Sequence, residues 1–267
     1  MVTHEAWLTR LFNAHLAGLG NWLLALFHQQ AANAAEPWAD FMVMQLTVAL
    51  LLIILFAILR SQLSVDKPSS LQHVFELIHG FLAGESEKHV GHDSRKHIVL
   101  FETLFCFILI SNLIGVIPGF VSPTQVIYVP AGCALISFLY FNIVGIKKHG
   151  LVKYTGHFAG PIWWMAPLMF IIEIISTLAR PLSLSIRLFA NMFAGEQVTL
   201  VFMSLTYLVI PALFMGLHVF VGLLQSYVFV VLTMMYVGGA VAEAHGSDHG
   251  SDHGDAHKGE HLAEAAA

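Results

Sequence analysis

The sequence predicts an all-α polytopic membrane protein with about five transmembrane helices. Of its 267 residues, 57% are hydrophobic and only 11% are charged, and the mean hydropathy is +0.74. Soluble domains carry about 25% charged residues. The chain also contains several apolar runs that reach the roughly 20 residues a helix needs to cross the hydrocarbon core. These observations exclude an ordinary soluble domain.

Four apolar stretches supply the predicted crossings. The first three are 41–59, about 98–117 and about 126–146. The last stretch, 161–242, is too long for one crossing, and a break near Pro211 divides it into two helices. The first of the two is longer than a straight crossing needs, which predicts a long, strongly tilted hairpin. Five is an odd number, so the termini are expected on opposite sides of the membrane.

The distribution of Lys and Arg among the short loops predicts the orientation. Loops 60–97 and 147–160 are basic, whereas the opposite loops, 118–125 and near 205–212, hold no Lys or Arg. Basic loops stay on the cytoplasmic side. We therefore expect the N-terminus outside and the C-terminus in the cytoplasm.

Two further segments are expected at the membrane surface. Residues 1–40 form an N-terminal outer segment with an amphipathic pattern of Trp and Leu. In the first basic loop, apolar residues at helical spacing over 71–82 follow Pro68-Ser69-Ser70. This pattern predicts a helix lying flat on the cytoplasmic surface. A short soluble helix packed on a partner fits the same pattern.

The C-terminal segment 243–267 is rich in His, Asp and Gly. Its histidines recur every four residues, at His245, His249, His253, His257 and His261. On a helix this spacing could bind metal, but the interspersed glycines disfavour a helix. We expect a disordered, solvated tail, and no metal or cofactor elsewhere. Cys106 and Cys133 both lie in apolar runs and are expected to be core residues.

Ionisable and amide side chains interrupt the last apolar stretch, and such residues are functional candidates by default. A guanidinium stays charged at any workable pH, and one near the bilayer centre costs about 2.5 kcal/mol or more. It is kept where it faces a partner, a wet cavity or an ion path. The residues concerned are Glu173, Arg180, Arg187, Asn191, Glu196, His218 and Gln225.

Helical geometry separates the roles of these residues. Ser183, Asn191 and Ala194 share the Arg187 face, which is therefore lined by small or polar groups that let a neighbouring helix approach. Glu196 lies nine residues after Arg187, on nearly the opposite face and about 13 Å further along the axis. A simple salt bridge between Arg187 and Glu196 is not expected.

In an antiparallel hairpin, residues at similar distances from the turn lie side by side on the two helices. Glu196 would lie near His218, and Gln225 near Arg187. Imidazole titrates near neutral pH in water, which suits proton transfer. Structural roles remain open for each residue alone: His218 and Gln225 as satisfied hydrogen-bonding groups, and Arg180 as an ion pair with Glu173 or as a snorkelling side chain.

Three motifs stand out in the sequence: RPLSLSIRLFANMFAGE (180–196), HVFVGLLQ (218–225) and ILISNLIGVIP (108–118). They resemble subunit a of the bacterial F-type ATP synthase. The resemblance covers about residues 36–242 and implies a stator subunit in the inner membrane. Its implied partners are the c-subunit ring, the b-subunit peripheral stalk and membrane lipid. The transported ion is expected to be a proton, although the choice against sodium resides largely in the ring.

The resemblance also implies site roles. Arg187 corresponds to the arginine that faces the ring, displaces the proton from the ring carboxylate and separates two half-channels within 41–242. The resemblance implies further roles along the proton path. The outer half-channel is lined by Glu196 and His218, and its outer mouth by Asp40. Close to the arginine lie Asn191 and Gln225. Towards the cytoplasmic half-channel lie Ser183, Arg180 and Glu173.

The chain departs from the family pattern at the start of the third span. Many members carry a pattern like PT-x-D-x-N, whereas this chain has PTQVIYVPAG (123–132). Gln125 and Tyr128 are the residues left to supply polarity. Glu102, inside the second span, has no counterpart in the pattern.

Two other classes of protein fit the sequence less well. A secondary transporter would usually show inverted repeats, and a membrane hydrolase using His218 and Glu196 as metal ligands would want an H-E-x-x-H cluster; the sequence has neither. It also lacks a G-x-x-x-x-G-K-[ST] run. We therefore expect a non-catalytic subunit that binds neither nucleotide nor nucleic acid directly.

Overall fold

The computed structural model describes residues 7–26, 37–64, 68–117, 120–150, 166–205 and 209–242. Most residues in these ranges are helical, and no strand occurs among the described residues. The His-rich tail and most of the second basic loop lie outside the described residues. The predictions made for them therefore stay predictions.

Five of the described helices are long and apolar enough to cross a membrane, as the sequence predicted. They are α2 (Asp40–Gln62), α4 (Ser94–Ile114), α5 (Tyr128–His149), α7 (Ala166–Leu205) and α8 (Val209–Ala242). The second crossing begins and ends a few residues before its predicted bounds. Just after α4, a Cβ on Gly115 would lie 2.6 Å from the Cβ of Ser122. The chain after α4 thus folds back tightly against the helix end.

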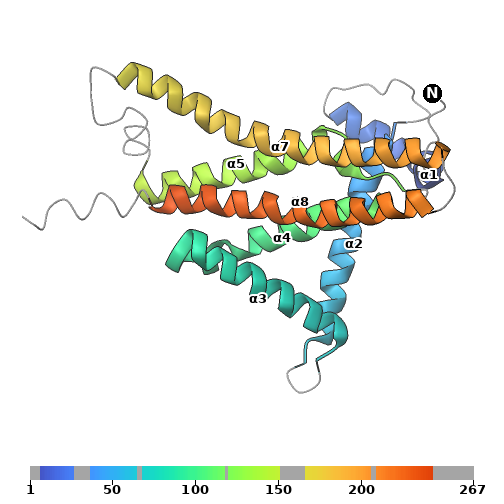
Figure 1. Cartoon of the computed structure of the whole chain (residues 1–267), viewed down its shortest axis with the longest axis horizontal. Coiled ribbons are helices and arrows are strands. Elements are labelled where there is room, and N and C mark those ends of the chain that lie inside the picture. The colour runs from blue at the N-terminus through green and yellow to red at the C-terminus, as the bar shows by residue number, and fades with distance from the viewer. Residues whose placement is uncertain are drawn as a thin grey trace, which may run out of the picture.

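Helices α7 and α8 form the predicted long hairpin. At 1.5 Å per residue, the 40 residues of α7 span about 60 Å, twice the thickness of the hydrocarbon core. Figure 1 shows α7 and α8 side by side along the longest axis of the molecule, and in this view α2 runs crosswise to that axis. Pro211 lies in the first turn of α8 rather than in the break. Proline is tolerated there because the first N–H groups of a helix have no intrahelical partner.

The N-terminal helix α1 (Trp7–Leu26) is attached to the start of α2. The Asn13 side chain accepts from the Trp38 backbone N–H (3.0 Å) and donates to the Trp38 carbonyl (3.3 Å). The Trp38 indole donates to the Leu16 carbonyl at 2.9 Å. Trp7 and Trp22 stay exposed, as expected of an amphipathic helix at a membrane surface.

The surface pattern near residue 70 forms helix α3 (Ser70–Val90), longer than the predicted 71–82. Ser69 caps it by accepting from the Gln72 backbone N–H. One side of α3 packs on α4 and α8, with Leu82 fully buried. The His79 imidazole contacts the Glu102 carboxylate of α4. This contact accounts for the acid inside the second span, which the family pattern left unexplained.

The core lies where α4 and α8 meet. Its largest fully buried side chains include Phe101 and Ile108 from α4, and Phe229 and Met234 from α8. Cys106 and Cys133 are buried in the same core, as predicted. The close packing of α4, α5 and α8 gives α7 a firm surface to lie on.

Candidate functional site

Arg187 lies on an exposed face of α7. Ser183, Asn191 and Ala194 are exposed on the same face, as helical spacing predicted. The adjacent face of α7, about 100° round the helix, is buried against the bundle through Leu184, Leu188 and Met192. In the part of the chain that the structure describes, no side chain forms an ion pair or hydrogen bond with the Arg187 guanidinium. The charge is therefore presented outward from the subunit.

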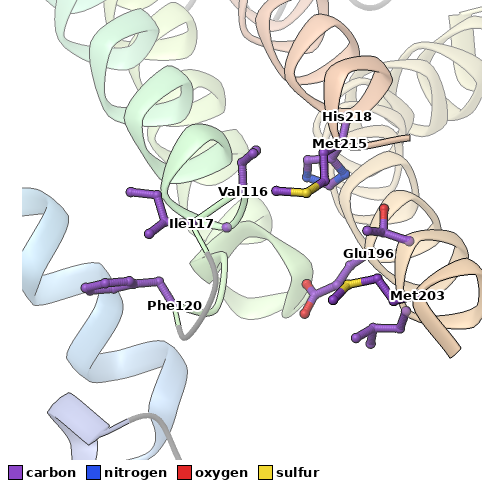
Figure 2. A pocket seen from close by; sticks show the side chains of 10 residues that line it. Val116, Ile117, Phe120, Glu196, Met203, Met215 and His218 are labelled. Carbon is purple, nitrogen blue, oxygen red and sulfur yellow. The ribbon is translucent and has the colours of Figure 1, made fainter. Parts of the chain in front are cut away.

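Glu196 and His218 line one cavity of about 240 Å³. Figure 2 shows them on the neighbouring helices α7 and α8, beside the chain that follows α4. The antiparallel hairpin thus brings the two residues to one level, as their distances from the turn predicted. The other labelled side chains around the cavity are apolar: Val116, Ile117, Phe120, Met203 and Met215. An acid and an imidazole share a space in which few other groups can exchange protons.

Gly195 makes room for the His218 ring. A Cβ at this position would lie 2.5 Å from Nδ1 of His218 and 3.0 Å from Cε1. Real Cβ atoms essentially never approach other heavy atoms so closely, so any larger residue would displace the imidazole. The glycine before Glu196 therefore fixes how near the histidine of α8 can come to α7.

A second cavity, of about 360 Å³, lies on the Asn191 side of His218. His218 lines both cavities, and Ala194, Gly195 and Val221 also line the second. The imidazole consequently stands between the space that contains Glu196 and the space that reaches Asn191. Polar groups are in this way spaced along the hairpin in the order Glu196, His218, Asn191.

The amide pair continues this order to the level of Arg187. Asn191 Nδ2 donates to Gln225 Oε1 at 2.7 Å. Gln225 is only 4% exposed, and its Nε2 has no hydrogen-bond partner among the described residues. Gln225 therefore lies within one helical turn of the Arg187 level, where sequence spacing placed it.

The remaining predicted site residues lie away from the two cavities. Glu173 and Ser183 precede Arg187 along α7, and Asp40 is the first residue of α2. Arg180 has its guanidinium carbon 5.4 Å from the centre of the Tyr236 ring, a cation–π contact to α8. This contact is the partner that the structure gives Arg180, in place of the alternative pairing with Glu173.

Gln125 contacts a residue of the site. It is one of the two residues available to replace the family's polar pattern. It closes the short 3-10 helix η2 (Pro123–Gln125). Its surroundings assign the amide nitrogen to the side that faces Glu196, where it contacts both oxygens of the carboxylate as a donor. Tyr128 does not meet the site: it is 70% exposed and its ring lies 5.8 Å from that of Phe41. Tyr128 does not supply polarity beside Glu196, because α5 starts at this residue and directs it towards α2.

A buried hydrogen-bond network that sequence reasoning missed holds η2 in place. Ser122 Oγ donates to the Ser111 carbonyl (2.8 Å), and Thr124 Oγ1 donates to Asn112 Oδ1 (2.8 Å). Asn112 Nδ2 in turn donates to the Gly222 carbonyl of α8 (3.0 Å). Asn112 lies within the family motif 108–118. Its place in that motif is the sequence signal that could have pointed to it.

The fold and this site define a polytopic membrane protein whose longest hairpin carries charged and amide side chains through an apolar environment. Residues 41–238 match the family described as ATP synthase A chain. The ATP synthase subunit a of Solibacter usitatus is 57% identical over 235 residues, which cover 88% of this chain and 100% of that protein. That of Koribacter versatilis is 43% identical over 245 residues, covering 92% and 99%.

A third relative, the ATP synthase subunit a of Geobacter sulfurreducens, is 47% identical over 178 residues, covering 67% of this chain and 77% of that protein. The chain belongs to the ATP synthase A chain family, the subunit a family of ATP synthase. The resemblance drawn from the three motifs is confirmed. So is the prediction of a proton-translocating membrane component that is not itself the catalytic subunit.

Proposed function

We propose that this chain is the stator subunit that forms two proton half-channels against the c-subunit ring of a rotary ATP synthase. Arg187 separates the half-channels and displaces the proton from each ring carboxylate as it passes. The observation that carries the proposal is the exposed guanidinium on a small-residue face of a membrane-spanning helix. Left facing lipid, such a charge costs from about 2.5 kcal/mol to above 10 kcal/mol, depending on the scale. A partner helix that brings a carboxylate close would remove most of this cost.

The shape of the Arg187 face supports a moving helical partner. Ser183 and Ala194 have short side chains, so a neighbouring helix could approach α7 closely. The charge of Arg187 is permanent, so a proton cannot pass along this face by protonating it. A ring carboxylate opposite Arg187 would be held ionised, and it would accept a proton only after moving away.

The outer half-channel is assigned to the two cavities. A proton would reach Glu196 in the first cavity, transfer through His218, and leave the second cavity beside Asn191 and Gln225 for a ring carboxylate. Each step uses a group that can bind or orient a proton, and the apolar lining limits other routes. Moving one charge through 100 mV releases about 2.3 kcal/mol, which drives rotation.

The cytoplasmic half-channel is assigned to the earlier part of α7. Ser183 and Glu173 precede Arg187 by four and 14 residues, within about 40° of its direction on the helix. The released proton would leave along them, on the other side of the arginine from Glu196. Asp40, at the start of α2, is proposed for the outer mouth.

The remaining assignments follow from the same arrangement. The basic loop 60–97 is placed in the cytoplasm, with the N-terminus outside and the C-terminus inside a bacterial inner membrane. Residues 41–242 are assigned to the channel domain and 1–40 to the outer segment, while the segment 243–267 lies outside the described residues. The partners are the c-subunit ring, the b-subunit stalk and lipid, and the transported ion is a proton rather than sodium.

Cysteine cross-linking in the assembled enzyme tests the proposed face. Ala194→Cys places a thiol on the exposed side of α7, whereas the control Leu188→Cys places one on the buried side. Both native cysteines are buried, so they do not compete. We expect oxidation to link the residue-194 thiol, but not the residue-188 thiol, to a cysteine beside the ring carboxylate. Equal linking of both, or of neither, contradicts the proposal.

A further inference from the structure

Gln125 belongs to the connection between α4 and α5, yet it lies against the acid of α7. Its amide donates to the Glu196 carboxylate, and the segment η2 that carries it contacts α2, α4, α5 and α7. Glu196 is partly buried and faces the cavity that it shares with His218. Gln125 is thus a hydrogen-bond donor to the acid from outside the hairpin.

The position of Gln125 is fixed by the residues just before it. Ser122 and Thr124 are fully buried, and their hydroxyl oxygens lie 2.7 Å apart. Thr124 is joined through Asn112 to α8, and the Gln125 backbone N–H donates to the Ser122 carbonyl at 3.3 Å. A side chain on so constrained a backbone can hold another group in one place. An amide on a mobile loop could not.

The chemistry of the two side chains differs in one respect that matters for proton transfer. A carboxylate can accept and release a proton, whereas a neutral amide donates hydrogen bonds without titrating. Gln125 can therefore orient Glu196 without becoming a second proton-binding station. Proton-transfer groups work only within hydrogen-bond reach of their partners, directly or through one water.

We propose that Gln125 is a positioning residue for proton transfer, which holds the Glu196 carboxylate in the orientation that faces the His218 cavity. The inference rests on the proposed function, since it assigns Gln125 to the same proton path. It adds a residue outside the three family motifs. It also accounts for how this chain works with an amide and no acid in the segment 123–132.

Exchanging the acid and the amide tests the contact. Three variants are compared in the complete ATP synthase reconstituted in liposomes: Glu196→Gln, Gln125→Glu/Glu196→Gln, and Gln197→Glu/Glu196→Gln. The last is a matched control, because it has the same composition and moves the acid one residue along α7 to an exposed position. We expect Glu196→Gln to slow proton-driven ATP synthesis, the exchange with position 125 to restore a substantial part of the rate, and the exchange with position 197 to restore none.

The outcomes separate the two proposals. If Glu196→Gln slows synthesis but neither exchange restores it, the role of Gln125 is overturned while the proposed function stands. If Glu196→Gln has no effect, the assignment of Glu196 to the proton path fails, and the role of Gln125 fails with it. Recovery that is equal in both exchanges also overturns the role of Gln125.

A double-mutant cycle keeps the inference testable if the exchanged variant does not assemble. Gln125→Leu is measured with Glu196 present and in the Glu196→Gln background. We expect a several-fold loss of rate in the first case and little further loss in the second, because contacting residues are energetically coupled. Independent losses would show that Gln125 acts only on folding, which contradicts the inference.

Discussion

Asn191 on α7 donates its side-chain N–H to Oε1 of Gln225 on α8, across a distance of 2.7 Å. One partner is exposed on the Arg187 face and the other is 4% exposed in the hairpin interior. The bond therefore links the outward arginine face to the interior, and it fixes the register of the two helices.

Loss of this bond should destabilise the hairpin. Asn191→Leu would leave the buried Gln225 carbonyl oxygen without a partner, at a cost of about 1–3 kcal/mol. Asn191→Leu/Gln225→Leu should cost less than the sum of the two single changes, because the partners are removed together. Thermal unfolding of the reconstituted subunit measures this, with the exposed Gln197→Leu as control. Strict additivity would mean that the bond contributes nothing.

Enlarging Gly195 should impair proton transfer without unfolding the protein. In Gly195→Ala the new methyl group would overlap Nδ1 of His218, and overpacking of this kind costs about 1–3 kcal/mol. We expect a several-fold slower passive proton flux through the membrane sector. Gly216→Ala is the matched control on α8, since its Cβ would meet nothing within 4 Å. Equal fluxes in the two variants would contradict the close approach of His218 to α7.

The network under η2 should be needed for a stable site. Thr124→Val removes the hydroxyl that donates to Asn112 and leaves a buried amide oxygen with one partner fewer, so we expect a loss of about 1–3 kcal/mol. Thr103→Val is the comparison, because the Thr103 hydroxyl is exposed and bonds only to its own helix. Denaturation midpoints of the two variants check this. A midpoint for Thr124→Val as high as that for Thr103→Val would show that the network is dispensable.

The ends of α4 and α5 are held together by a charge cluster. Asp93 accepts from Lys148 Nζ (2.7 Å) and Lys96 Nζ (2.8 Å). These bonds, the Lys148 bond first, hold the pKa of the Asp93 carboxyl well below its ordinary 3.8. A lowered folded-state pKa adds stability that is present above the ordinary value and is lost as the pH falls below it.

Asp93→Asn should therefore lower the thermal midpoint equally at pH 7 and pH 5, with the difference shrinking below about pH 3.8. About 1 M salt should weaken the effect, because the Debye length is then about 3 Å. Lys148→Met should reproduce it, whereas Lys147→Met, one residue away, should not. If the difference in thermal midpoint grew as the pH fell, the contribution of Asp93 to stability would depend on pH in the opposite direction, which would contradict this prediction.

Sequence alone predicted the parts that depend on local pattern. Apolar runs set the five crossings, because bilayer thickness fixes their length. Helical arithmetic put Asn191 on the Arg187 face and brought Glu196 level with His218. Contacts made by the connections could not be derived in this way. Gln125 contacts Glu196, and Tyr128 does not, because of the way η2 packs against α7. This packing joins segments that are far apart in the sequence.

The contacts of the residues that position the site also could not be predicted from the sequence. Gly195 and Asn112 lie inside recognisable motifs, but only the assembled helices reveal that one makes room for His218 and the other ties η2 to α8. Glu102 is unexplained in sequence and is matched by His79 only once α3 packs on α4. Non-local partners of this kind have no periodic signature.

The most direct measurement concerns Arg187 itself, in liposomes containing the complete enzyme. ATP synthesis driven by an imposed proton gradient is compared with passive proton flux through the membrane sector, for the parent enzyme and for Arg187→Ala. If Arg187 separates two half-channels, the substitution abolishes synthesis and still permits passive flux, because the barrier is gone while both half-channels remain. Full synthesis by Arg187→Ala would contradict the account.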